Sequence, residues 1–160
     1  MVAEARRGAE LPPLLLAARD AALAGRGDES RAILEQAARL APNNGRVWVL
    51  LAEQRRQGGD PEGSLVAAAK AMEVGTNEEK SDALVCAGLV EVQRKQYLVA
   101  ADRFRNAQRY APTNELAYAF EAKSRLDGGD RLGARVALKR GLAAVPGGQH
   151  LEALRAEIGI

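Results

Sequence analysis

The residue types that most often carry out chemistry are scarce in this chain of 160 residues. It contains one histidine, His150, and one cysteine, Cys86, which lie far apart in the sequence. Acid–base or nucleophilic catalysis needs several reactive groups that converge on one point. A helix-start or surface histidine and a packed cysteine are therefore the interpretations that we favour. We expect no enzyme activity.

Phosphate and metal sites are also not indicated. The stretches GRGD at 25–28 and GGD at 128–130 are rich in glycine, but they do not form a Walker loop and suit turns between helices. Asp60 and Glu62 lack the spacing of a metal-binding loop. A single cysteine excludes an intrachain disulfide and a metal site made of several cysteines. We expect neither a metal nor a cofactor.

Charge and hydropathy exclude two further classes of function. The chain has 23 Lys and Arg against 21 Asp and Glu, and their signs alternate along the sequence. This pattern indicates a solvated helical surface rather than a nucleic-acid-binding one. No apolar run reaches the roughly 18 residues of a membrane span, since Glu10, Arg19 and Asp20 flank the apolar stretch at 11–18. We expect no membrane insertion and a cytoplasmic location.

The elements that would position any site follow an internal repeat. The segments RLAPNN and RYAPTN occupy equivalent places in the repeat. Their prolines, Pro42 and Pro112, are 70 residues apart, and Pro146 follows Pro112 by 34 residues. Between these prolines, small and bulky residues recur at helical spacing, and glycines fall where turns are needed. The clearest matches are Trp48, Leu51 and Ala52 in the second unit, Gly88, Ala100, Phe104 and Ala107 in the third, and Tyr118, Ala122 and Ala134 in the fourth.

This pattern resembles the tetratricopeptide repeat (TPR) family over about residues 11–148, close to the whole chain. The resemblance implies an all-α fold, a right-handed superhelical solenoid of about four helix-turn-helix hairpins at 11–44, 45–78, 81–114 and 115–148. Leu151, Leu154 and Ile158 share one helical face, so residues 149–160 are expected to form a capping helix over the last repeat. Residues 1–10 would be an N-terminal extension, with Pro12 and Pro13 opening the first helix.

The sequence departs from the family pattern in three places. Thr76 replaces a closing proline and two extra residues follow, which predicts a longer helix or a wider loop there. Glu121 stands where leucine is usual, which suggests looser packing in the last repeat. Late in each first helix, where the family often has tyrosine, the chain has charged residues: Arg55, Glu91 and Arg125. Either these are surface positions at which the residue type has drifted without consequence, or they form a ladder of alternating charge.

In this family the first helix of each hairpin lines a concave groove that holds a segment of another protein. Carried over place by place, the partner-binding groove would comprise Leu15, Arg19, Arg46, Val49, Glu53, Arg56, Val85, Leu89, Val92, Leu116, Phe120 and Lys123. The later members form an apolar face that the hairpin core does not require, unless the capping helix or a second copy of the chain covers it.

The resemblance therefore implies a non-catalytic adaptor or chaperone-like module that binds a protein or peptide partner. The Lys, Asn and Arg cluster with which some family members grip a terminal carboxylate is missing from the corresponding places. The alternative is a structural subunit that binds copies of itself, as a homo-oligomer or as the scaffold of a larger complex.

Overall fold

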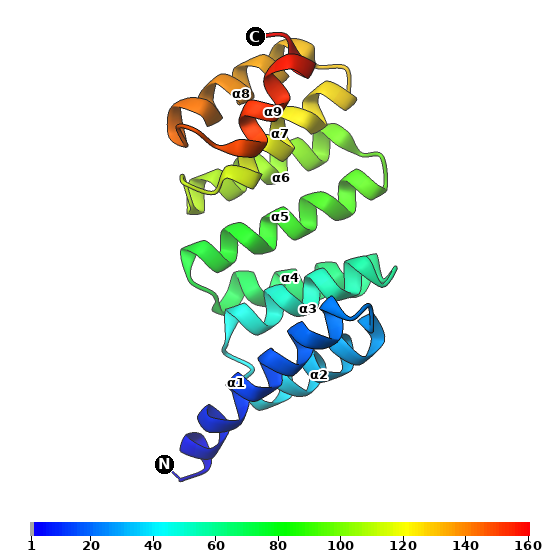
Figure 1. Ribbon diagram of the computed structural model, residues 1–160, viewed down its shortest axis with the longest axis vertical. Coiled ribbons are helices and arrows are strands. Elements are labelled where there is room, and N and C mark those ends of the chain that lie inside the picture. The colour runs from blue at the N-terminus through cyan, green and yellow to red at the C-terminus, as the bar shows by residue number, and fades with distance from the viewer. Residues whose placement is uncertain (1) are drawn as a thin grey trace. The chain divides into compact units, whose positions relative to one another are not determined.

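The chain folds into helices joined by short turns, so the predicted all-α fold is confirmed (Figure 1). The structure is a computed structural model that describes the backbone of residues 2–160 and the side chains of residue 6 and residues 8–160. Over this range there is no strand, and no helix is long and apolar enough to cross a bilayer. The helices are α1 (Val2–Leu23), α2 (Gly27–Leu40), α3 (Gly45–Gln57), α4 (Pro61–Val74), α5 (Asn77–Gln93), α6 (Tyr97–Tyr110), α7 (Glu115–Asp127), α8 (Arg131–Ala144) and α9 (Gln149–Ile158).

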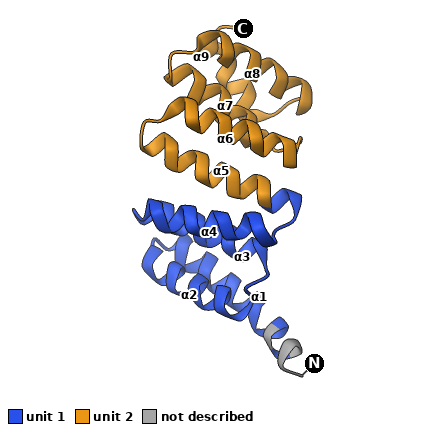
Figure 2. Cartoon of the chain, turned by 180° about the vertical axis from the view of Figure 1, so that it is seen from behind, with its two compact units in different colours: residues 1–79 blue, residues 80–160 orange. Residues whose placement is uncertain are grey.

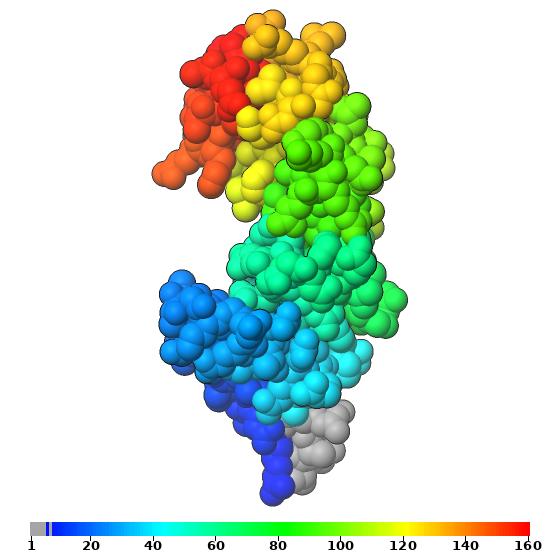
Figure 3. All heavy atoms as spheres, turned by 90° about the vertical axis from the view of Figure 1, so that its right-hand side faces the viewer, coloured from blue at the N-terminus to red at the C-terminus, as the bar shows by residue number. Residues whose placement is uncertain are grey.

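The helices form two compact units, residues 1–79 and 80–160 (Figure 2). In the first unit, α1 packs on α2, α2 on α3, and α3 on α4. In the second unit, α7 packs against α6, α8 and α9, and α8 also packs against α9. Within each unit, the space-filling view shows the atoms of consecutive helices in contact (Figure 3). Each unit is therefore a layered stack that buries one side of every hairpin against its neighbour.

Tight turns of three residues join α1 to α2, α3 to α4, α5 to α6, and α7 to α8. The middle residue has a positive φ, which is 79° at Gly59 and 84° at Gly129. Lys95 takes this position in the α5–α6 turn, with φ of 59°, although side chains disfavour that conformation. Asp60 and Asp130 then cap the next helices, since their carboxylates accept the backbone N–H of residues 63 and 133.

The repeated prolines are tied to the helices that follow them. The Trp48 indole N–H donates to the Pro42 carbonyl at 2.8 Å, and the Tyr118 hydroxyl donates to the Pro112 carbonyl at 3.0 Å. In each pair the two residues are six positions apart, and the second pair follows the first by 70 residues. The aromatic residue of each pair therefore fixes the loop that enters its helix, in addition to filling space beside the small residues.

Close approach within a hairpin is clearest between α5 and α6. A Cβ atom on Gly88 would lie 2.5 Å from Cε1 of Phe104, which is fully buried. A non-bonded carbon pair needs roughly 3.5–4 Å. Glycine at this place is thus required by the ring of its partner helix, as the alternation of small and bulky residues predicted.

Two element boundaries are less regular. α1 contains Pro12 and Pro13 in its interior and does not begin at them, so the expectation that these prolines open the first helix is wrong. At the α4–α5 junction, the predicted longer helix is confirmed, because α5 has 17 residues where α3 and α7 have 13. The Thr76 hydroxyl accepts the Glu79 N–H at 3.3 Å and the Glu79 carboxylate accepts the Thr76 N–H at 2.8 Å. This reciprocal cap starts α5 early.

Candidate functional site

In the first unit, three of the predicted groove residues meet at one pocket between α1 and α3. Leu15 and Arg19 lie four residues apart on α1 and reach it together, and Glu53 reaches it from α3. The pocket has a volume of about 140 Å³. Its other walls are mainly apolar and come from α1, α2 and α3: Ala18, Ala22, Ser30, Leu34, Leu50 and Gln54. The pocket thus offers an apolar hollow with one cation and one anion beside it.

The carboxylate of Glu53 is already held by its own helix. Arg56 donates to it from Nε at 3.0 Å and from Nη2 at 2.6 Å, and the Gln57 amide donates at 2.6 Å. A carboxylate and a guanidinium joined by two parallel bonds have a fixed orientation. Arg19 is exposed and pairs only loosely with the neighbouring Asp20, at 3.5 Å. The anion of this pocket is therefore preorganised, whereas the cation can turn toward a ligand.

Two other predicted residues of α3 lie apart from this pocket. Val49 is buried in the first unit, and Arg46 is exposed at the start of α3. Val49 therefore supports the packing of α3 rather than offering free surface.

In the second unit, the apolar part of the predicted face belongs largely to the core. Val85 is buried in a cluster with Phe104, and Leu89, Val92 and Phe120 pack against the same cluster. The rings of Phe104 and Phe120 are 5.5 Å apart, centroid to centroid. The expectation that this face is separate from the hairpin core is wrong for Val85, because the close α5–α6 packing draws the Phe104 ring across to it.

The exposed part of this face lies on α7, beside the C-terminal helix. Leu116 is exposed, and Lys123 pairs with Asp127 at 3.1 Å and with Glu157 of α9. The hydrogen bond to Glu157, followed by that to Asp127, raises the pKa of the Lys123 ammonium. Helix α9 also packs along α7 and contacts it near both ends, through Glu115 and Lys123, yet Leu116 stays exposed.

A second contact fixes the start of α9. Glu115 accepts the backbone N–H of His150 at 2.6 Å and that of Leu151 at 3.3 Å. Partial burial raises the pKa of the Glu115 carboxyl, but the N–H donors of His150 and Leu151 outweigh it and hold the pKa below its ordinary value. A carboxylate at a helix N-terminus also meets the positive end of the helix dipole. His150 is therefore a helix-start residue.

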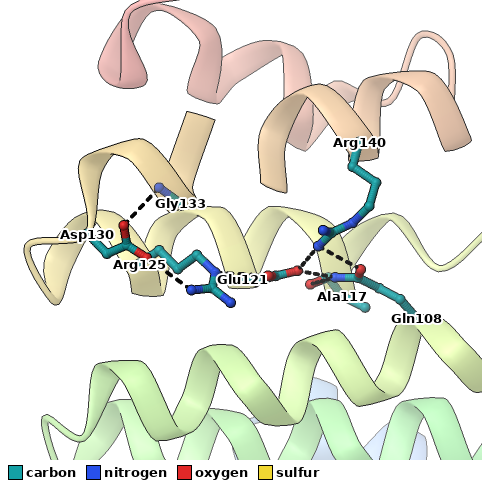
Figure 4. A network of polar contacts seen from close by, with 7 residues as sticks. All are labelled: Gln108, Ala117, Glu121, Arg125, Asp130, Gly133 and Arg140. Atoms are coloured by element: carbon teal, nitrogen blue, oxygen red, sulfur yellow. Dashed lines mark hydrogen bonds and ion pairs between the residues drawn. The ribbon is translucent and has the colours of Figure 1, made fainter. Parts of the chain in front are cut away.

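Sequence reasoning missed a buried polar network around Glu121 (Figure 4). Glu121 is 1% exposed and lies between two arginines: it accepts from Nε of Arg125 at 2.9 Å and from Nη2 of Arg140. The Gln108 amide also donates to it at 2.7 Å. The expectation of loose packing at Glu121 is wrong, because three donors from α6, α7 and α8 replace the apolar contacts of a leucine.

The network continues to the cap of α8. Asp130 accepts the backbone N–H of Gly133 at 2.8 Å and Nη1 of Arg125 at 3.0 Å. The N–H of Gly133, and then the guanidinium of Arg125, hold the pKa of Asp130 below its ordinary value. Glu121 and Arg125 lie four residues apart on one helix, and this spacing is a sequence signal that could have found the pair.

The charged residues at the tyrosine positions each have a partner on a second helix or turn. Arg55 pairs with Glu35 of α2 at 3.5 Å, Glu91 with Arg103 of α6 at 3.5 Å, and Arg125 with the α8 cap. All three side chains are at least partly buried, so these are not simply exposed positions at which any residue type is tolerated. A charge ladder among the three stays a prediction.

The candidate reactive groups do not converge. Cys86 is buried in α5, whereas His150 is exposed at the start of α9. Among the side chains that the structure describes, no three of the types His, Cys, Asp and Glu gather in a way that could hold a metal ion.

Comparison with known proteins places the fold. No protein-family model and no curated protein sequence matches this chain. Similar solved structures include MamA, with a TM-score of 0.70 and 17% identity, over 94% of this chain and 77% of that chain. Another is YrrB, described as a TPR protein with an unusual peptide-binding site (TM-score 0.67, 16% identity, 87% of this chain and 71% of that chain). A third is a thermophilic TPR protein of Thermus thermophilus, TTC0263 (TM-score 0.66, 18% identity, 93% of this chain and 83% of that chain). This chain has the tetratricopeptide repeat fold.

Proposed function

We propose that this chain is a non-catalytic protein-interaction module, an adaptor or chaperone-like protein. It binds a segment of a partner protein on the faces of α1 and α3 in the first unit and of α5 and α7 in the second. A cytoplasmic setting belongs to this proposal and suits a chain with one cysteine.

The observation that carries this proposal is the pocket between α1 and α3. A cavity near 150 Å³ can hold a benzene ring, so a pocket of about 140 Å³ suits one large apolar side chain. Arg19 and Glu53 beside it would meet polar groups of the same segment. An apolar anchor in a pocket with a polar surround is the arrangement in which a few residues supply most of the binding energy.

Two further points support the proposal. On α7, Leu116 is exposed beside the partly buried Phe120, which gives the second unit its own apolar contact point. YrrB, whose fold is similar, is described as having a peptide-binding site. Fold alone does not determine function, so the assignment depends on the pocket and on Leu116.

The experiment compares adjacent residues of one helix. Leu15→Glu places a charge in the pocket, whereas Leu16→Glu changes an exposed neighbour that does not line it. Affinity capture with mass spectrometry should identify a partner that the wild type and Leu16→Glu retain and that Leu15→Glu and Leu116→Glu both lose. Circular dichroism should show unchanged helicity in all variants. Capture that survives Leu15→Glu and Leu116→Glu would contradict the proposal.

A self-assembling scaffold is the second candidate, and one observation favours it. Leu16 and Leu23 lie seven residues apart on α1 and are both exposed. A helix face of this kind can pair with a second copy of itself. Light scattering over a concentration series should then show a dimer that Leu23→Glu dissociates. A monomer at every concentration would exclude this candidate.

A further inference from the structure

In the second unit, charge is segregated between helices, in contrast to the alternation expected from the sequence as a whole. Helices α6 and α8 together carry seven Lys and Arg and a single acidic residue, Asp102. α8 alone has four basic residues and no acidic one. Such a surplus attracts anionic groups and speeds their encounter with the surface.

A pocket of about 330 Å³ lies within this basic region, between α6, α7 and α8. Arg105, Arg125 and Arg140 line it together with Leu132 and Val136. Leu132 is 75% exposed and Val136 is 54% exposed. Since neither contributes to the core, they leave an apolar rim beside three guanidinium groups.

The charges of the pocket do not balance. Arg125 and Arg140 are matched by the carboxylates of Glu121 and Asp130, which form the network of Figure 4. Arg105 is exposed, and no described carboxylate lies within ion-pair distance of it. Both described contacts of Arg140 use the same nitrogen, Nη2. One positive charge and several N–H groups are therefore available to a ligand.

We propose that this α6–α8 pocket binds an acidic segment of a partner protein, one in which an apolar side chain lies next to a carboxylate. The carboxylate pairs with Arg105 and with the open edge of Arg140, and the apolar side chain packs on Leu132 and Val136. This surface is separate from the α1–α3 pocket, because every residue that lines it belongs to the second unit.

A protein segment fits these groups better than a nucleic acid. Arg125 and Arg140 are already matched by Glu121 and Asp130, so the pocket has one surplus cation, Arg105, which can pair with one carboxylate but not with a continuous row of phosphates. It contains no aromatic side chain on which a base could stack. The exposed Leu132 and Val136 need an apolar partner, and an acidic peptide with leucine or phenylalanine supplies one.

The test uses the full chain and fluorescence anisotropy. The probe is a short fluorescein-labelled peptide built from Glu-Leu and Asp-Phe pairs, and its control has Gln and Asn in place of the acids. Oligothymidine DNA and phosphatidylserine vesicles are measured in parallel. The wild type should bind the acidic peptide, prefer it to all three other probes, and bind it more weakly as salt is added, because the contact is partly electrostatic.

Matched substitutions locate the binding. Arg105→Glu should weaken it roughly tenfold by replacing attraction with repulsion, and Val136→Ser should weaken it about threefold. The controls Arg39→Glu and Val66→Ser, on α2 and α4 of the first unit, should leave it unchanged; Val66 is 59% exposed, close to Val136. Leu15→Glu should also leave it unchanged, since that residue belongs to the other surface.

Several results would overturn the proposal. The first is failure of the wild type to bind the acidic peptide. The second is tighter binding of the DNA or of the vesicles than of the peptide. The third is a loss of peptide binding in Arg39→Glu and Val66→Ser equal to that in Arg105→Glu and Val136→Ser. A loss in Leu15→Glu alone would place the peptide in the α1–α3 pocket and would likewise refute this assignment, while leaving the proposed function intact.

Discussion

Removing the carboxylate of Glu121 should be among the most destabilising single changes in the second unit. Glu121→Ala deletes an acceptor that serves Arg125, Arg140 and Gln108, in a place that is 1% exposed. Breaking a fully buried ion pair costs roughly 3–5 kcal/mol, because the remaining charge loses its partner. Arg125 keeps Asp130, and Arg140 is partly exposed. The lower end, about 3 kcal/mol, is therefore the expected loss in the free energy of unfolding.

Urea denaturation followed by circular dichroism measures this loss. With a denaturant slope of about 2 kcal/mol per molar, the midpoint should fall by about 1.5 M. Glu152→Ala is the matched control, because Glu152 forms an exposed pair with Arg155 at 3.1 Å, and exposed pairs contribute at most about 1 kcal/mol. If Glu121→Ala lowers the midpoint no more than Glu152→Ala does, the network does not stabilise the fold as argued.

Two further changes probe the hairpin packing and the cap. Gly88→Ala should destabilise the chain by about 1–3 kcal/mol, because its Cβ would overlap the Phe104 ring. Gly8→Ala is the control and should not destabilise it, because no atom lies within 4 Å of the added Cβ. Equal urea midpoints for the two variants would refute the clash. The Glu115 carboxylate, whose pKa lies below the ordinary value of 4.5, should hold α9 in place above that pH and release it as the pH falls through the lowered pKa. The protection factor of the Leu151 amide, which is the ratio of its intrinsic to its observed hydrogen-exchange rate, should therefore fall in acid, and Glu115→Gln should remove most of this fall. A fall of the same size in the variant would exclude Glu115 as its source.

The helical architecture could be predicted from the sequence because its signals are local. Pro42 and Pro112 mark equivalent helix ends, and a small residue such as Gly88 predicts a bulky partner such as Phe104. Pro12 and Pro13 misled the assignment of the first helix. Proline is favoured in the first turn of a helix, yet α1 extends to both sides of the pair.

The side-chain environments were less predictable, because they depend on residues distant in sequence. Glu121 at a leucine position indicated loose packing, but its donors include Gln108 of α6 and Arg140 of α8, whose convergence only the fold produces. Val85 had the spacing of a groove residue and is buried against Phe104. Leu15, Arg19 and Glu53 do meet at one pocket, since helical spacing and repeat register both place them there.

Photo-crosslinking tests the central claim most directly. Benzoylphenylalanine replaces Leu15, Leu16 or Leu116 one at a time, and the captured partner is mapped by mass spectrometry. The account predicts crosslinks to the partner from the Leu15 and Leu116 positions, and few or none from the Leu16 position, which is one residue from Leu15 on the same helix. Crosslinks that form at Leu16 but not at Leu15 or Leu116 would contradict it.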